Sequence, residues 1–88
     1  MSYQETFKAL SDKTRREILS ILRSGPLTVG EIGEHFDISG ATLSHHLSIL
    51  RQADLIMDSK KGKFIYYELN TTVLDDIIVW IKSLKKED

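Results

Sequence analysis

The spacing of apolar residues changes at Leu55, and this change constrains the fold more than any other feature. Before Leu55, apolar residues recur every three or four positions, which is the period of amphipathic helices. After it, two stretches rich in β-forming residues, 55–58 and 64–69, flank a polar segment containing Gly62, which predicts a hairpin. After the second of these stretches, apolar residues again recur at helical spacing, as far as about Lys85. The chain is therefore expected to be mostly α-helical with one small β-hairpin.

Capping residues divide the helical part into separate helices. The predicted helices are 2–10; a second one to about Ser24, capped by Ser11; 28–36, capped by Thr28; 39–52, capped by Ser39; and a last one to about Lys85, capped by Asn70 or Thr71. The start of the third, Thr28-Val29-Gly30-Glu31, matches a capping box. The Gly25-Pro26 turn ends the second.

The segment 39–52 predicts a helix with two chemically different faces. Leu43, Leu47 and Leu50 form one narrow apolar stripe. The other positions carry small or medium-sized side chains rich in donors and acceptors: Ser39, Ala41, Thr42, Ser44, His45, Ser48, Arg51 and Gln52. An ordinary solvated face more often carries Lys and Glu, whereas the major groove of DNA offers mixed donors, acceptors and thymine methyls. We expect this face to contact bases.

The order of the predicted elements supports the same interpretation. A short helix, a tight turn, a polar-faced helix and a basic hairpin are the parts of a winged helix-turn-helix, in which the polar-faced helix enters the major groove. The hairpin carries Lys60, Lys61 and Lys63. These lysines are expected to contact phosphates, although an ordinary solvated turn has the same composition.

The size of the chain and its last helix predict self-association. Its 88 residues are expected to form a single domain, 1–88, in which one core is marginal and a second copy commonly covers apolar surface. The last helix has a wider apolar face than one packing contact needs. That face belongs either to the core or to a surface that binds another protein. The simplest interpretation is that it forms a homodimer interface together with the first helix. The predicted interface residues are Tyr3, Phe7, Val73, Leu74, Ile77, Ile78, Trp80, Ile81 and Leu84.

Composition and motifs exclude several other classes of function. There is no cysteine, so disulfides and thiolate metal sites are excluded. Adjacent His45 and His46 would point about 100° apart on a helix, so we expect no metal site and no cofactor. No nucleophile–base pair, catalytic carboxylate pair or phosphate-binding glycine loop is found, so no catalytic residues and no enzyme activity are expected. No secretion signal or membrane-spanning run is recognised, which predicts a cytoplasmic protein without membrane insertion.

Net charge argues weakly against DNA binding. The formal charge is −1, whereas a DNA-binding domain is usually basic overall. Between Ser39 and Lys63, however, four basic residues stand against two acidic ones. The sequence assigns no role to Arg15, Arg16, His46 or Ile49.

Three stretches of this chain resemble the ArsR-type bacterial repressors. They are Phe7–Leu19, Leu43–Ala53 and the hairpin segment Lys61–Asn70, and within the family the resemblance is strongest to the SdpR-like autorepressors. This resemblance implies a homodimer, built mainly from the first and last helices, that blocks transcription at a double-stranded DNA operator. By the same analogy, a sequestering partner protein could relieve repression.

The chain departs from the family pattern at residues that matter for sensing. Lys13 stands where many members have proline. The third predicted helix has no cysteine, and the last has Asp75 and Asp76 but no histidine, so the resemblance does not support metal sensing. The sequence and this resemblance thus predict a dimeric, autoregulatory repressor that recognises an imperfect inverted repeat. The alternative is a winged-helix module that binds protein rather than DNA.

Overall fold

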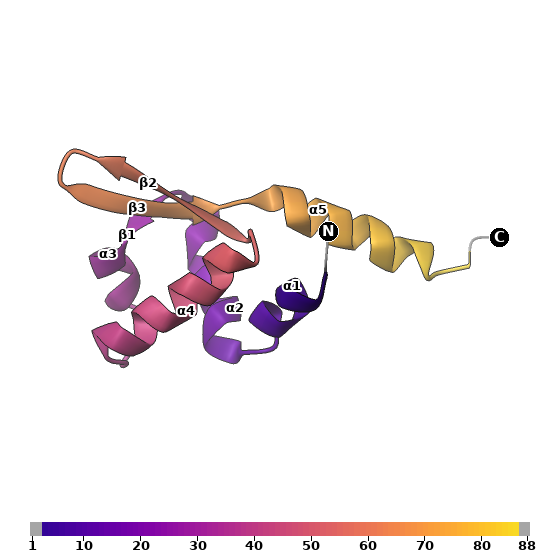
Figure 1. Cartoon of the computed structure of the whole chain (residues 1–88), viewed down its shortest axis with the longest axis horizontal. Helices are drawn as coiled ribbons and strands as arrows, with labels where there is room; N and C mark the ends of the chain where they lie inside the picture. Colours follow the sequence, from indigo (N-terminus) through magenta and orange to yellow (C-terminus); the bar gives the residue numbers. More distant parts are fainter. Residues whose placement is uncertain (1–2, 87–88) are drawn as a thin grey trace.

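A computed structural model describes residues 3–86 and confirms the winged helix-turn-helix fold (Figure 1). Its elements are α1 (Tyr3–Leu10), α2 (Lys13–Ile21), a 3₁₀ turn η1 (Leu22–Ser24), β1 (Leu27–Thr28), α3 (Val29–Gly33), α4 (Gly40–Gln52), β2 (Ile56–Lys61), β3 (Phe64–Leu69) and α5 (Thr71–Ser83). Ser2, the expected start of the first helix, lies outside the described residues.

The molecule is elongated because two elements project from its body in opposite directions. It measures 52 × 25 × 22 Å. The β2–β3 hairpin projects at one end and α5 at the other, with the remaining helices gathered between them (Figure 1). The sheet is antiparallel with strand order β1-β3-β2, so the two-residue β1 pairs with the outer side of the hairpin.

The core is assembled from the apolar stripes of the helices and the base of the hairpin. Its buried residues are Ala9, Ile18, Leu22, Ile32, Leu43, Leu47, Leu50, Ala53, Leu55, Ile56, Val73 and Ile77. The stripe of α4 is therefore fully used inside the chain, as its spacing predicted. Ile49, which lies away from that stripe, is half-buried against the same core. Gly33 passes close to α4: a Cβ there would lie 3.4 Å from the Leu43 side chain.

The cap of α2 corrects one sequence prediction. The N-cap is Asp12 rather than Ser11, and its carboxylate accepts a hydrogen bond from the Arg15 backbone N–H at 3.0 Å. The Ser11 hydroxyl instead donates to the Lys8 carbonyl, at the end of α1. A carboxylate is favoured over a hydroxyl here because the positive end of the helix dipole attracts negative charge.

Three helices are shorter than their apolar spacing predicted. The first is α2, which ends at Ile21 and is followed by the 3₁₀ turn η1 instead of continuing to Ser24. The capping box at Thr28 is confirmed, since its hydroxyl and the Glu31 carboxylate each accept the other residue's backbone N–H. However, α3 ends at Gly33 rather than Phe36, and the chain continues in tight turns. Two glycines in so short a segment weaken the helix. The last helix is capped by Asn70 and ends at Ser83 rather than Lys85.

The hairpin is longer than predicted, and its loop is correspondingly tighter. Lys61 pairs with Phe64, so only Gly62 and Lys63 remain in the loop. Gly62 has a φ of 63°, the left-handed conformation that the sequence prediction assigned to it. The strand β1 was not predicted, because a strand of two residues is too short to show the alternation of apolar and polar residues that marks a strand in a sequence.

A compact turn connects α4 to the hairpin and fixes their relative placement. Asp54 has a φ of 58°, and its N–H donates to the Arg51 carbonyl, while the Leu55 N–H donates to Leu50. This is the Schellman arrangement, which is completed here by two buried leucines, Leu50 and Leu55.

Candidate nucleic-acid interface

The polar face of α4 is open to solvent along its whole length. Because Leu43, Leu47 and Leu50 point into the core, the opposite side of the helix cannot be covered by the chain itself. The exposed residues on it are Ala41, Thr42, Ser44, His45, Arg51 and Gln52, and Ser48 is half-buried. The structure therefore brings all the predicted base-contacting side chains onto one accessible element.

The N-terminus of α4 is organised by its own cap. Ser39 caps the helix as predicted, accepting the Thr42 backbone N–H at 3.1 Å. Its hydroxyl also donates to the Thr42 hydroxyl at 2.9 Å. Both side chains are exposed, but their hydroxyls are held in place by each other. Ser39 and Thr42 are thus presented to a ligand in a fixed geometry.

Arg51 connects the end of α4 with the hairpin. Its Nη1 lies 3.6 Å from the Asp58 carboxylate on β2, and the two side chains are 53% and 35% exposed. An ion pair this exposed contributes little to stability, so the guanidinium can exchange Asp58 for a phosphate at small cost. The sequence did not reveal this pairing.

The hairpin presents its three lysines at the tip. Lys60, Lys61 and Lys63 are all exposed. The Lys61 ammonium lies 5.7 Å from the centre of the Tyr66 ring, and that of Lys63 lies 5.6 Å from the Phe64 ring. Such cation–π contacts restrain the lysines without removing their charge from solvent. The tip is therefore a small cationic surface at the projecting end of the hairpin.

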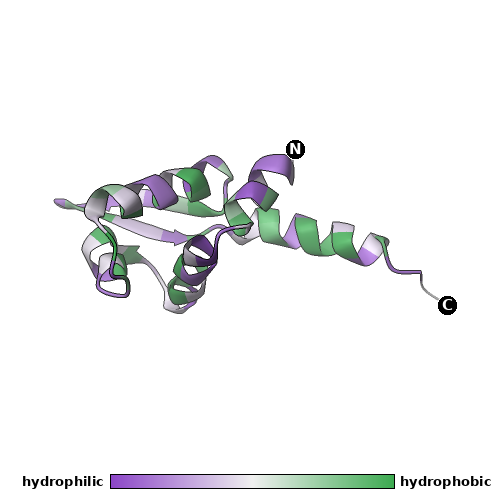
Figure 2. Ribbon diagram, turned by 90° about the horizontal axis from the view of Figure 1, so that it is seen from below, coloured by the Kyte–Doolittle hydropathy of each residue, from purple (hydrophilic) through white to green (hydrophobic). Residues whose placement is uncertain are grey.

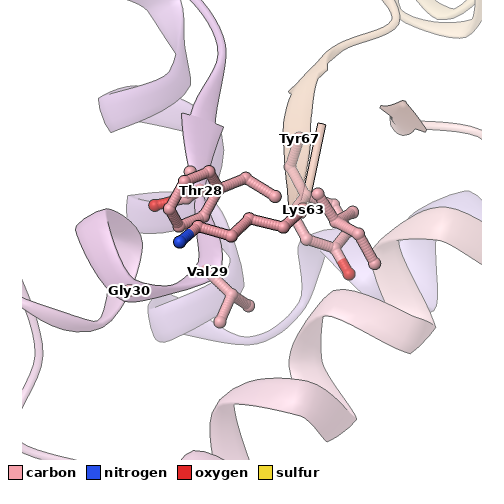
Figure 3. Close-up of a pocket in the computed structure, with 7 residues that line it drawn as sticks. Thr28, Val29, Gly30, Lys63 and Tyr67 are labelled. Atoms are coloured by element: carbon pink, nitrogen blue, oxygen red, sulfur yellow. The ribbon is translucent and has the colours of Figure 1, made fainter. Parts of the chain in front are cut away.

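An apolar groove separates the hairpin from the start of α3. It has a volume of about 400 Å³ and is lined by Thr28, Val29, Gly30, Lys63, Phe64, Ile65 and Tyr67 (Figure 3). Phe64 and Ile65 are about half exposed. The groove contributes apolar surface next to the lysine-bearing tip.

Arg15 and His46 are placed inside the molecule rather than at its surface. Arg15 is only 8% exposed, and its Nη1 lies 3.2 Å from Nδ1 of His46 on α4. The Asp12 carboxylate lies beside them, 3.9 Å from the same His46 nitrogen. The pKa of Asp12 is lowered, first by the hydrogen bond from the Arg15 backbone and then by the Arg15 charge. Arg16 donates to the Leu10 carbonyl at 2.8 Å.

The expected dimer residues divide into a buried and an exposed group. Val73 and Ile77 belong to the chain's own core, so a partner could not reach them, and Tyr3 and Leu74 are half-buried. Phe7, Ile78, Trp80, Ile81 and Leu84 are exposed. The projecting α5 is coloured as apolar along most of its length in Figure 2.

An aromatic cluster joins the two helices of this apolar surface. The Trp80 ring on α5 lies 6.1 Å from that of Tyr3 and 5.7 Å from that of Phe7, both on α1. Tyr3 and Phe7 pack edge to face at 6.3 Å. The exposed apolar side of α5 and the start of α1 thus form one continuous face.

The structure also bears on metal and membrane sites. Within residues 3–86, no three His, Cys, Asp or Glu side chains lie close enough together to hold a metal ion. No helix in that part of the chain has the length and apolar character needed to cross a membrane.

The sequence matches known regulators over the segment that contains α4. A model of the bacterial regulatory protein family arsR matches residues 12–58. The chain is 60% identical over 75 residues to the transcriptional repressor SdpR of Bacillus subtilis (strain 168), covering 85% of this chain and 83% of that protein. The chain belongs to the ArsR family. It is also 44% identical over 81 residues to an arsenical resistance operon repressor of Staphylococcus aureus, covering 89% and 78% of the two chains.

Solved structures of other proteins share the architecture. An ArsR-like transcriptional regulator from Rhodococcus sp. RHA1 superposes with a TM-score of 0.88 at 26% identity, covering 93% of this chain and 75% of that one. HlyU from Vibrio cholerae N16961 superposes with a TM-score of 0.74 at 30% sequence identity, covering 91% of this chain and 87% of that one. The ArsR family match spans α2 to the beginning of β2, so it includes α3 and α4 but neither α1 nor α5.

Proposed function

We propose that this protein is a transcriptional repressor that binds its operator DNA through α4 and the β2–β3 hairpin. The observation that carries the proposal is the division of α4 into a stripe buried in the core and an exposed face of Ser, Thr, His, Arg and Gln side chains. His45, Ser44, Ser48 and Gln52 contact bases, and Ala41 and Thr42 approach the edge of the groove. Membership of a family of regulatory proteins supports this function over catalysis.

The lysines of the hairpin tip and Arg51 position the protein on the DNA. Phosphate contacts fix orientation but carry no sequence information, and the exposed cations of the tip and of Arg51 can supply them. The overall charge of −1 then predicts moderate affinity for random DNA, because only this local cationic surface attracts phosphates. The polar face of α4 and this cationic tip favour DNA over a protein partner as the ligand.

The repressor acts as a homodimer through the exposed face formed by α1 and α5. A two-fold dimer presents two copies of α4, so the operator is an imperfect inverted repeat with half-site centres about one helical turn, or a multiple of it, apart. The resemblance of the sequence to the SdpR-like autorepressors supports autoregulation, with an operator in the promoter region of the repressor's own gene. Its place of action is the cytoplasm, where that DNA lies.

Footprinting of the purified protein on its own promoter region tests this function. We expect a protected inverted repeat at protein concentrations well below those that coat random DNA of the same length. Uniform coating without a protected segment, or no binding at all, would favour the winged-helix module that binds protein.

The repressor requires no metal for release from DNA. The chain has no cysteine, and its three histidines are split between the turns after α3 (His35) and α4 (His45 and His46). We therefore expect zinc or cadmium at stoichiometric levels to leave the footprint unchanged. By analogy with the family, a sequestering partner protein is the proposed means of relieving repression. Release by either metal, reversed by EDTA, would contradict this.

A further inference from the structure

Arg15 makes hydrogen bonds to two other helices from a buried position in the first turn of α2. Its Nε donates to the Ala9 carbonyl at 2.9 Å, and its Nη2 donates to the Lys8 carbonyl at 3.1 Å. These carbonyls belong to the last turn of α1, and that of Lys8 also accepts the backbone N–H and the hydroxyl of Ser11. The negative end of the α1 dipole also favours a cation here. The guanidinium is therefore fixed to the end of α1.

The third contact of Arg15 reaches α4. Its Nη1 lies 3.2 Å from His46 Nδ1, across 31 residues of sequence. A guanidinium can only donate, so Nδ1 must accept, and the ring proton of His46 must sit on Nε2. Asp12, at 3.9 Å, is too far from the same nitrogen for a hydrogen bond, so Arg15 is the group that meets Nδ1 at hydrogen-bond distance.

His46 is the immediate neighbour of His45, and the two rings lie 6.2 Å apart. His46 points inward, with 13% of its side chain exposed, whereas His45 is open to solvent on the polar face. The contact with Arg15 therefore ties the inward side of α4 to the end of α1, the helix that carries Tyr3 and Phe7, in addition to the packing of the α4 leucine stripe.

We propose that Arg15 and His46 are positioning residues, whose hydrogen bond holds α4 at a set orientation relative to the α1–α5 face. This inference rests on the proposed function. In a two-fold dimer the orientation of each α4 determines whether both reach their half-sites together. Random DNA, bound through phosphates alone, does not need that alignment.

The test compares two substitutions at His46. His46→Leu removes the acceptor, while His46→Asn offers an amide oxygen near the position of Nδ1. Binding is measured for the footprinted duplex and for a random duplex of equal length. We expect His46→Leu to lower the preference for the operator about tenfold or more, as the loss of a charge-assisted hydrogen bond implies, with random-DNA affinity unchanged. His46→Asn should retain most of the preference for the operator. A full preference in His46→Leu, or no rescue by His46→Asn, would overturn the proposal.

Arg15 and Arg16 offer a matched pair should His46→Leu fail to fold. Both guanidiniums bond to carbonyls at the end of α1, but only that of Arg15 also reaches α4. Lysine keeps the charge and loses the multiple contacts of the guanidinium. Arg15→Lys should therefore lower the operator preference, and Arg16→Lys should not. Equal effects of the two substitutions would contradict the positioning role.

An independent measurement separates this inference from the proposed function. In the free protein, nitrogen NMR of the His46 ring should show an unprotonated Nδ1 and a protonated Nε2. Protonation at Nδ1 would overturn the hydrogen bond whatever the DNA results. Conversely, a wild-type protein with the expected ring state and no operator preference would contradict the proposed function while leaving the contact intact.

Discussion

The helices α4 and α5 have the same length but leave opposite kinds of surface exposed. Each has 13 residues. In α4, all three leucines of the stripe are buried, and what remains outside is polar. In α5, Val73 and Ile77 are buried, but the same stripe continues through Ile81 and Leu84, which are 47% and 66% exposed.

The difference follows from where each helix lies relative to the body. The helix α4 crosses the core, so its whole stripe finds partners within the chain, whereas α5 runs out beyond the core (Figure 1). Exposed apolar residues arranged as a continuous stripe mark an interaction surface, whereas scattered ones do not. The apolar stripe of α4 is therefore covered within the chain, whereas that of α5 is left open for the second copy that we propose as its partner.

The largest expected effect is loss of the dimer on substitution of Ile81 by Asp. Burying one aliphatic side chain contributes about 1.5–3 kcal/mol, and a two-fold interface holds two copies, so the dimer should dissociate roughly 10²- to 10⁴-fold more readily. Sedimentation at a series of protein concentrations measures the dissociation of the dimer. Val79→Asp is the control, because Val79 is 68% exposed but lies on the opposite side of α5 from the stripe. An intact dimer of the Ile81 variant would remove α5 from the interface.

The next effect concerns reading of the operator by α4. Replacing His45 by Ala should reduce discrimination between operator and random DNA by about 1–3 kcal/mol, roughly 5- to 150-fold. Binding of random DNA should be nearly unchanged, since the phosphate contacts remain, and circular dichroism should show an intact fold. His35→Ala is the control, because His35 is also exposed but lies outside α4. Unchanged discrimination in the His45 variant would show that α4 does not read the sequence.

A smaller effect is expected at the hairpin tip. Each lysine replaced by Ala among Lys60, Lys61 and Lys63 should weaken binding to operator and random DNA alike. Each lost phosphate contact should flatten the slope of log K against log salt by about 0.9. The control is Lys82→Ala, because Lys82 lies on the projecting α5, away from the hairpin tip. If the hairpin variants and this control have the same slope, the lysines belong to a solvated turn.

The smallest effect is the pH dependence that Asp12 confers. Its pKa is lowered in the folded protein, chiefly by the Arg15 backbone hydrogen bond. Asp12 therefore contributes stability above its ordinary pKa, and this contribution is lost as pH falls through the lowered value. Wild type should melt at a higher temperature than Asp12→Asn near pH 7, and the gap should close in acid below about pH 4. A gap independent of pH would contradict this.

Local features of the sequence were sufficient for most of the fold. The capping box at Thr28, the cap at Ser39 and the left-handed Gly62 were all predictable, because each involves residues within a few positions of one another. The choice between Ser11 and Asp12 was not, because both can cap a helix and only the path of the chain distinguishes them.

The sequence by itself determined the order of the elements, the stripe of α4 and the polar face opposite it, because these follow from helical periodicity. Only the tertiary structure decided which residues of the α5 stripe are buried, that Leu27–Thr28 pairs with β3, and that Arg15 meets His46. Each of these depends on residues far apart in the chain. Neither periodicity nor capping reports which distant segments will pack together, so the link between α1 and α4 became visible only in three dimensions.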